Sequence, residues 1–186
     1  MTNGDLLIIG ASTGGPKILE ELVPRLQLRS TAVLIIQHIT PYIDKAFVTS
    51  LARKSAMPVS LGGHEDYLQK GHITVAPGGS HLVLCNNLRI CLTREEPVNS
   101  VRPSIDVTMK SVVRTPHRLA GVILSGMGRD GAEGIIHLKK LGATTIAQDK
   151  HTSVIYGMPK AAAETDCIDF VLPTVRIADK VMEILS

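Results

Sequence analysis

The stretch LLIIGASTGGP, residues 6–16, decides the fold, because it joins the end of a strand to the start of a helix. Residues 6–9 are a short apolar run followed by a glycine, which is typical of a buried strand. After Gly14 and Gly15, apolar residues recur at helical spacing, and Pro16 suits the first turn of a helix. A buried strand that turns tightly into a helix is typical of the first βα unit of a parallel sheet.

The same alternation continues beyond this unit. Residues 32–36 are a second apolar run, and residues 42–56 predict an amphipathic helix with Ile43, Phe47 and Leu51 on one face. This order of strand, helix, strand and helix predicts parallel strands that are joined by right-handed crossovers.

The middle of the chain predicts a different pairing. Residues 73–76, 82–84 and 88–92 read as short strands of a meander or hairpin, an antiparallel edge of the same sheet. Further strands are expected at residues 119–124, 144–147 and 168–172, and further helices at residues 104–113, 131–141 and 177–185. We therefore expect one α/β domain over residues 1–186: a doubly wound, mainly parallel, Rossmann-like three-layer sheet with an antiparallel hairpin.

Composition limits the classes of function. Aromatic residues make up 3% of the 186 residues and tryptophan is absent, which disfavours a stacking platform for single-stranded nucleic acid. The net charge of +3 is too small to predict a nucleic-acid partner. No apolar run is long enough to cross a membrane, and residues 1–5 lack a secretory signal, so we expect a cytoplasmic protein.

Three cysteines are too few for a disulfide scaffold. A two-residue turn at residues 86–87 would pair Cys85 with Leu88 across the hairpin. The same turn would pair Cys91 with Leu82, so we expect Cys85 and Cys91 to be reduced, ordinary strand residues.

Residues 10–14, GASTG, fit the G-x-S-x-G nucleophile elbow, in which a sharp turn leaves the serine, here Ser12, exposed. The backbone N–H groups of such a turn also suit an oxyanion. A phosphate-binding loop and a simple tight turn remain alternatives. Two phosphate motifs fit poorly, because a dinucleotide fingerprint needs glycine at Ser12 and a Walker loop needs lysine at Pro16.

His38 and Asp130 supply the other parts of a triad. His38 follows the second strand, and the carboxyl ends of parallel strands meet at one edge, so Ser12 and His38 should share a rim. His38 would take the serine proton, and Asp130 would orient the imidazole. The alternatives are a structural histidine and a helix N-cap. The order Ser, His, Asp differs from that of the α/β-hydrolases.

The other histidines carry less weight. His81, in a neighbouring loop, could approach the site. No metal ion or other cofactor is expected, because paired metal-ligand spacing is absent at the remaining histidines, for which solvated or packing roles are expected: His64, His72, His117, His137 and His151.

These motifs, in this order, resemble the catalytic domain of the chemotaxis-receptor methylesterase family (CheB), from about residue 6 to the C-terminus. The resemblance implies hydrolysis of glutamyl methyl esters on the cytoplasmic helices of methyl-accepting chemoreceptors, often with deamidation of glutamines there. The matching stretches are residues 9–16 (IGASTGGP), 37–38 (QH), 76–82 (APGGSHL), 102–107 (RPSIDV), 124–132 (LSGMGRDGA) and 156–159 (YGMP).

The resemblance also implies roles for single residues. Ser12 matches the family's nucleophile, His38 its base and Asp130 its orienting acid. Thr13 and Met127 match positions beside the reacting carbonyl, so their backbone N–H groups are candidates for binding the oxyanion. The implied partners are chemoreceptor helices. We expect a monomer with no nucleic-acid partner and no direct membrane insertion.

The family usually places a phosphorylatable receiver domain ahead of this domain. Here the first strand begins at residue 6, so we expect a single methylesterase catalytic domain without a receiver, either excised or standing alone. Two other functions stay open: an esterase or amidase for another acyl substrate, and a non-catalytic module that binds receptors or phosphate.

Overall fold

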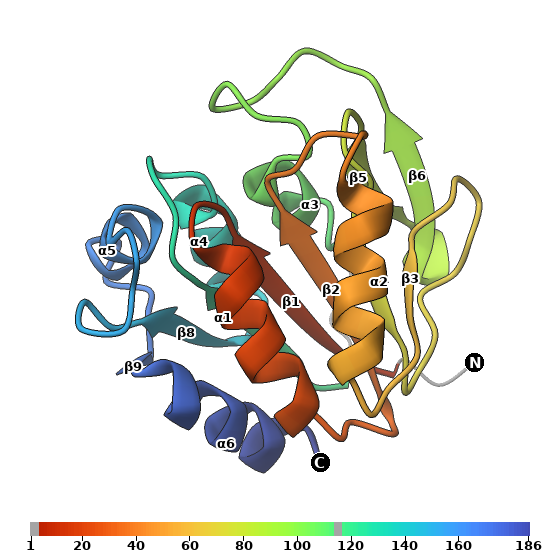
Figure 1. Ribbon diagram of the computed structural model, residues 1–186. Coiled ribbons are helices and arrows are strands. Elements are labelled where there is room, and N and C mark those ends of the chain that lie inside the picture. The colour runs from red at the N-terminus through yellow and green to blue at the C-terminus, as the bar shows by residue number, and fades with distance from the viewer. Residues whose placement is uncertain (1–3, 114–116) are drawn as a thin grey trace.

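A parallel sheet with helices on both faces forms the centre of the molecule (Figure 1). This computed structural model describes residues 4–113 and 117–186; residues 1–3, where a secretory signal was considered, lie outside that part. The strands are β1 (Asp5–Ala11), β2 (Thr31–Gln37), β3 (Val59–Leu61), β4 (Ile73–Val75), β5 (His81–Cys85), β6 (Arg89–Thr93), β7 (Leu119–Ile123), β8 (Thr144–Gln148) and β9 (Phe170–Leu172). The helices are α1 (Gly15–Leu22), α2 (Asp44–Lys54), α3 (Ile105–Lys110), α4 (Ala132–Lys140), α5 (Met158–Ala163) and α6 (Thr174–Leu185).

The sheet follows the strand order β3-β4-β2-β1-β7-β8-β9, and every neighbouring pair of these strands is parallel. Every residue of β1 and β2 is buried. These strands are covered on both faces, which explains why their sequences are nearly continuous apolar runs.

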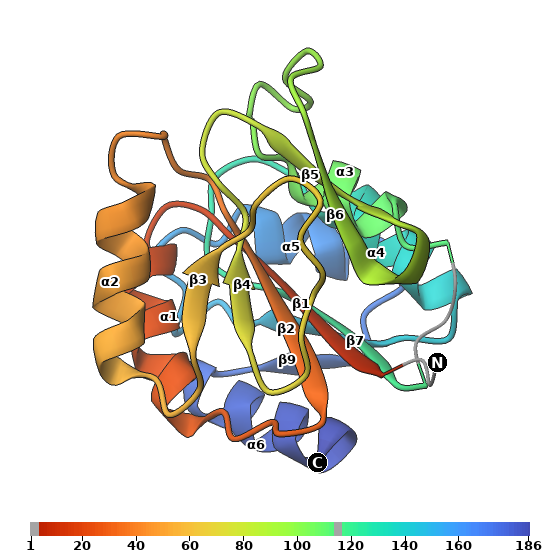
Figure 2. The ribbon, with the colours of Figure 1, turned by 90° about the vertical axis from the view of Figure 1, so that its right-hand side faces the viewer.

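Successive side chains of β1 point to opposite faces and join two separate cores. Leu7 and Ile9 pack with α1, α2 and α6, whereas Leu6 and Ile8 pack with α3, α4, α5 and the β5–β6 hairpin. Figure 2 shows these two layers on either side of the sheet. The expected doubly wound, three-layer arrangement is confirmed.

The chain changes direction across the sheet at β1. From β1 it passes through α1 to β2 on one side, and it later returns to β7 on the other side. In doubly wound sheets such a switch point opens a crevice at the carboxyl ends of the strands, where ligands bind. The loops after β1, β2 and β7 meet at this edge, near the top of the sheet in Figure 1.

Two expectations about the middle of the chain were wrong. The β5–β6 hairpin forms a two-stranded sheet of its own, and β4 lies in the main sheet, parallel to β2 and β3. Strand β3 and helix α5 were not predicted. They are three and six residues long, too short to show a clear hydrophobic period.

The expectation that Cys85 and Cys91 are reduced was also wrong, because the structure joins them in a disulfide. A three-residue turn, Asn86–Leu88, replaces the expected two-residue turn and pairs Cys85 with Arg89 and Cys91 with Val83. A register change of one residue moves a side chain to the other face of a strand. The expected register separates the two cysteines, whereas the observed one puts them on the same face as diagonal neighbours.

In the described ranges, no helix has both the length and the apolar character that crossing a membrane requires.

Candidate active site

Ser12 lies in the turn between β1 and α1. Its N–H donates to the Ser125 carbonyl (2.9 Å), and its own carbonyl accepts from Gly15 N (2.8 Å). The turn depends on Gly14, whose φ of 82° is strained for other residues and whose absent Cβ would collide with Val154. This tight turn from strand to helix is the geometry that the nucleophile-elbow pattern predicts.

His38 lies beside Ser12 because the strands that carry them are paired. Ala11 and Gln37, the last residues of β1 and β2, face each other, and His38 N donates to Ala11 O (3.0 Å). The imidazole Nε2 lies 2.8 Å from Asp130 Oδ2, and the histidine side chain is 11% exposed. None of the hydrogen bonds among the described residues joins the Ser12 hydroxyl to His38.

Asp130 is a buried acceptor in the loop between β7 and α4. It does not cap α4, whose N-cap is Gly131, so the N-cap alternative was wrong. Five donors converge on its carboxylate: Asn99 Nδ2 (2.8 Å), Ser104 Oγ (2.8 Å) and Asp106 N (3.3 Å) at Oδ1, and His38 Nε2 (2.8 Å) and Ile105 N (2.6 Å) at Oδ2.

These donors decide the charge of Asp130. Burial raises its pKa, but hydrogen bonds from His38, Asn99, the Ile105 N–H and Ser104 outweigh burial, so the pKa lies below its usual value. The carboxylate is therefore ionised at neutral pH and accepts the Nε2 proton of His38. The other ring nitrogen, Nδ1, is left as the basic atom of the imidazole.

A second buried carboxyl lies behind the first. Asp106 Oδ1 accepts from Gly131 N (2.9 Å) and Gly134 N (2.7 Å), and Asn99 Nδ2 bridges Asp106 Oδ2 (2.9 Å) and Asp130 Oδ1. Burial raises the pKa of Asp106, and the charge of Asp130 adds to this, although the Gly134 N–H opposes it. Sequence reasoning gave no role to Asn99, in an irregular loop, or to Asp106, which reads as an ordinary acidic residue in a first helical turn.

The raised pKa of Asp106 predicts a pH-dependent stability difference. A carboxyl with a higher pKa in the folded state binds its proton more readily when folded, so stability falls as pH rises from the unfolded toward the folded value. We expect Asp106→Asn to gain stability relative to the wild type as pH rises above about 4, the ordinary value for aspartate. Urea unfolding across this interval measures the difference, and a difference that is constant with pH would contradict the assignment.

Two backbone amides beside Ser12 have no acceptor among the described residues, namely Thr13 N–H and Met127 N–H. The carbonyl in the same peptide unit as the Met127 N–H is that of Gly126. It accepts from Gly157 N (3.1 Å) and Met158 N (2.8 Å). These two hydrogen bonds fix the orientation of the peptide unit, and its N–H has no acceptor among the described residues.

The loop after β7 lies directly against the Ser12 turn. A Cβ on Gly126 would come within 2.7 Å of Ser12 Cβ, so only glycine fits this approach. Ser125 Oγ donates to Thr13 O (2.8 Å) and accepts from Ile155 N (2.9 Å), which ties three loops together. The structure thus brings the expected site residues Ser12, His38, Asp130, Thr13 and Met127 to one edge of the sheet.

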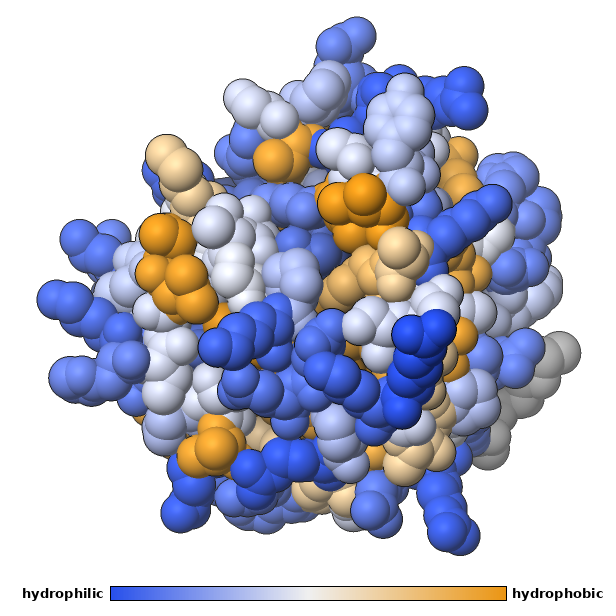
Figure 3. All heavy atoms as spheres, viewed as in Figure 1, coloured by the Kyte–Doolittle hydropathy of each residue, from blue (hydrophilic) through white to orange (hydrophobic). Residues whose placement is uncertain are grey.

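The rim of the site exposes apolar side chains. Met127 is 78% exposed, and Val154, which lies next to Gly14, is 59% exposed. On the face of the molecule drawn in Figure 3, which is viewed as in Figure 1, apolar residues form separate patches among hydrophilic ones.

His81 does not join the triad directly. It is buried, its Nδ1 accepts from Ser104 N (3.1 Å), and its Nε2 donates to Glu96 O (3.1 Å). It therefore holds in place the segment that contains Ser104, whose hydroxyl donates to Asp130. Within the described ranges, no three His, Cys, Asp or Glu side chains gather in a way that could hold a metal ion.

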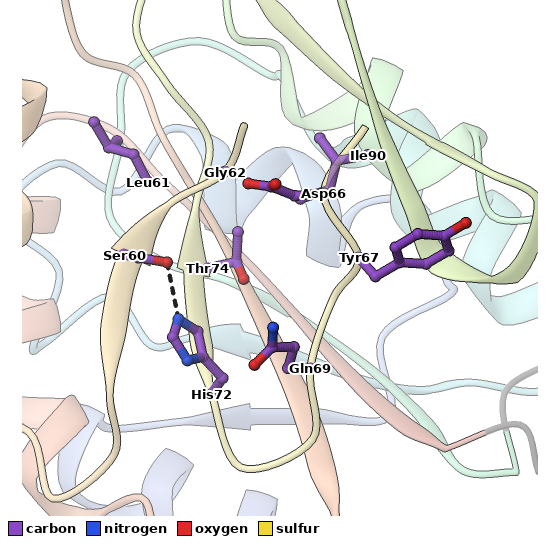
Figure 4. A pocket seen from close by; sticks show the side chains of 9 residues that line it. All are labelled: Ser60, Leu61, Gly62, Asp66, Tyr67, Gln69, His72, Thr74 and Ile90. Atoms are coloured by element: carbon purple, nitrogen blue, oxygen red, sulfur yellow. Dashed lines mark hydrogen bonds between the residues drawn. The ribbon is translucent and has the colours of Figure 1, made fainter. Parts of the chain in front are cut away.

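A second serine and histidine pair lines a separate pocket of about 160 Å³ along β3, β4 and residues 62–69 (Figure 4). Ser60 Oγ and His72 Nε2 are 2.8 Å apart. No carboxylate among the described residues hydrogen-bonds to His72, and burial lowers the pKa of this histidine. Asp66 also lines the pocket, but its Oδ2 accepts from Gly63 N (2.8 Å). His72 therefore has no orienting acid among the described residues, and the edge with Ser12 is the better candidate for nucleophilic catalysis.

Comparisons with known proteins point to one family. The family model described as CheB methylesterase matches residues 7–181. The chain is 44% identical to a protein-glutamate methylesterase/protein-glutamine glutaminase of Haloarcula marismortui, over 97% of this chain and 50% of that protein. A protein of the same name from Symbiobacterium thermophilum is 43% identical, over 95% of this chain and 49% of that protein. The chain therefore spans about half the length of these relatives.

A solved structure covers nearly all of the chain. The crystal structure of the Thermotoga maritima CheB methylesterase catalytic domain superposes with a TM-score of 0.90 at 34% sequence identity. The match covers 97% of this chain and 98% of that one.

Proposed function

Because the chain belongs to the CheB methylesterase family, we propose that it hydrolyses glutamyl methyl esters on chemoreceptors, with Ser12, His38 and Asp130 as its catalytic triad. The observation that carries this proposal is the 2.8 Å hydrogen bond between His38 and an ionised, buried Asp130, directly beside the Ser12 turn. An imidazole held in this way is a base for a neighbouring hydroxyl.

Attack on the ester begins at Ser12. Its hydroxyl turns toward His38 Nδ1 when substrate binds, since catalytic hydrogen bonds often form only in the substrate complex. Nδ1 takes the proton as Ser12 Oγ forms a bond to the γ-carbonyl carbon, and the carbonyl oxygen becomes an oxyanion. The unpaired N–H groups of Thr13 and Met127 are our candidate donors to this oxyanion.

Collapse of the tetrahedral intermediate breaks the bond to the methoxy group. The protonated His38 returns its proton to the leaving oxygen, which gives methanol and a glutamyl ester of Ser12. A water molecule then attacks this ester and gives a proton to His38. The protonated His38 passes this proton to Ser12 Oγ as that oxygen leaves, which frees glutamate and Ser12. Asp130 stays ionised throughout and stabilises the imidazolium.

The same steps can deamidate glutamine, the second activity in the names of the relatives. Ammonia leaves the tetrahedral intermediate of an amide only after the nitrogen is protonated. We therefore expect deamidation to be slower than ester hydrolysis at this site. The chemistry uses groups of this chain and water alone. We place the protein in the cytoplasm, as a monomer acting on the cytoplasmic helices of methyl-accepting chemoreceptors.

The test is methanol release from membranes that carry methylated chemoreceptors, compared with hydrolysis of a small p-nitrophenyl ester. The proposal predicts receptor-dependent release by the wild type and by Ser60→Ala, and none above background by Ser12→Ala. Hydrolysis of the small ester alone would favour an esterase for another substrate. Binding of receptor without hydrolysis of either would favour a non-catalytic module.

A further inference from the structure

Gln37, the last residue of β2, links the two loops that carry Ser12 and His38. The residue is 3% exposed, and its side-chain Nε2 donates to Ser12 O (3.0 Å) and to His38 O (3.1 Å). Its other amide atom, Oε1, is buried without a hydrogen-bond partner among the described residues. The amide thus contacts both loops through backbone atoms and leaves one of its own atoms unpaired.

The two carbonyl contacts fix which way the amide points. Only the NH₂ end can donate, and the reversed orientation would set Oε1 against two carbonyl oxygens. The orientation leaves Oε1 unpaired in the interior, which destabilises the fold. A side chain that only stabilised the fold would not leave a buried acceptor unpaired. The contacts of Gln37 with Ser12 and His38 therefore require a reason other than stability.

That reason lies in the geometry of one peptide unit. Ser12 C=O and Thr13 N–H belong to the same trans peptide, in which the two groups point in opposite directions. Donors from Gln37 and Gly15 hold the carbonyl, so the Thr13 N–H points away from them and is unpaired. We propose that Gln37 is a positioning residue, which holds the Thr13 N–H toward the developing oxyanion; this inference rests on the proposed function.

Close packing makes this contact rigid. A Cβ on Gly15 would collide with Gln37 Oε1 and with Ala11 Cβ, so the first turn of α1 lies directly against the amide. The second contact, to His38 O, ties the same amide to the loop of the base. Gln37 therefore couples the position of the nucleophile loop to that of the general base.

The test replaces Gln37 with methionine, which has a similar length but no donor. With methylated receptors as substrate, we expect kcat to fall roughly 10- to 100-fold with KM within about twofold, because a misaligned donor weakens binding of the transition state only. The rate at which a fluorophosphonate labels Ser12 should fall by a similar factor, since its tetrahedral oxygen needs the same donors. The pH profile of kcat should keep its wild-type shape, because the substitution retains the His38 imidazole and the Asp130 carboxylate bonded to it.

Thr31→Val is the matched control. Thr31 is buried at the opposite end of β2, and its Oγ1 also donates to a backbone carbonyl, that of Leu185 (3.0 Å). We expect this variant to lose stability and keep the wild-type kcat, whereas Gln37→Met and the shorter Gln37→Leu lose kcat without a matching loss in melting temperature.

Two results would overturn the inference. If Gln37→Met and Gln37→Leu keep the wild-type kcat while Ser12→Ala is inactive, the positioning role is wrong and the proposed function stands. If Ser12→Ala releases methanol as fast as the wild type, the proposed function fails and this inference fails with it.

Discussion

Replacing Ser12 with alanine is expected to lower kcat for ester hydrolysis by about 10⁴- to 10⁶-fold, because the covalent route is lost and only oxyanion binding remains. The substitution should change the free energy of unfolding by less than about 0.5 kcal/mol, since the hydroxyl makes no hydrogen bond to a described residue. Methanol release and urea unfolding measure the two effects separately.

Ser60→Ala is the matched control for this experiment, because Ser60 also lies within hydrogen-bond distance of a histidine, His72. This variant should keep the wild-type kcat. A Ser12→Ala protein that retains more than about one hundredth of the wild-type rate would contradict the role of Ser12 as nucleophile.

Asp130→Asn is expected to have the second largest effect, on both catalysis and stability. An asparagine can accept through one atom only, so its NH₂ group would face donors that now bind the carboxylate. Loss of the orienting charge should lower kcat by about 10²- to 10⁴-fold. The unpaired donors should lower the free energy of unfolding at neutral pH by about 3 kcal/mol.

The stability effect of Asp130→Asn should depend on pH in a defined direction. The folded state lowers the pKa of Asp130, so the carboxylate stabilises the fold at pH above its unfolded value. This contribution is lost as pH falls through the folded value, and the wild type and the variant should then converge. Urea unfolding at neutral and acid pH tests this. The exposed Asp179→Asn, which loses only surface ion pairs with Arg25 and Arg176, should show a small difference at every pH.

The order of strands and helices could be predicted because each central strand is buried on both faces. Such strands appear in the sequence as apolar runs, and the glycine-rich turn at residues 10–15 marks where the first one meets its helix. Ser12 and His38 could be placed together for the same reason, since both directly follow paired parallel strands.

The register of the hairpin could not be predicted in this way, because it depends on the length of one turn. The three-residue turn Asn86–Leu88 moves the register by one residue and brings Cys85 and Cys91 to one face. Hydrophobic pattern alone does not fix a register when both strands are only partly buried.

The hydrogen-bond partners of Asp130 could not be predicted from the sequence either. Its local sequence fits a helix N-cap, yet its carboxylate binds groups between 24 and 31 residues earlier in the chain. Asn99, the most distant of these, comes from an irregular segment without periodicity. Contacts of this kind arise from tertiary packing, which a local rule cannot anticipate. The same holds for Gln37, whose role depends on which way its amide points.

The most direct test of the central claim is to map the residue that a fluorophosphonate modifies, by peptide mass spectrometry of the intact wild-type protein after reaction. We predict a single adduct on Ser12, strongly reduced in a folded His38→Ala variant, because the hydroxyl needs this base. An adduct on Ser60, or an unmodified Ser12 in a protein that still releases methanol from methylated receptors, would contradict the assignment of Ser12 as the nucleophile.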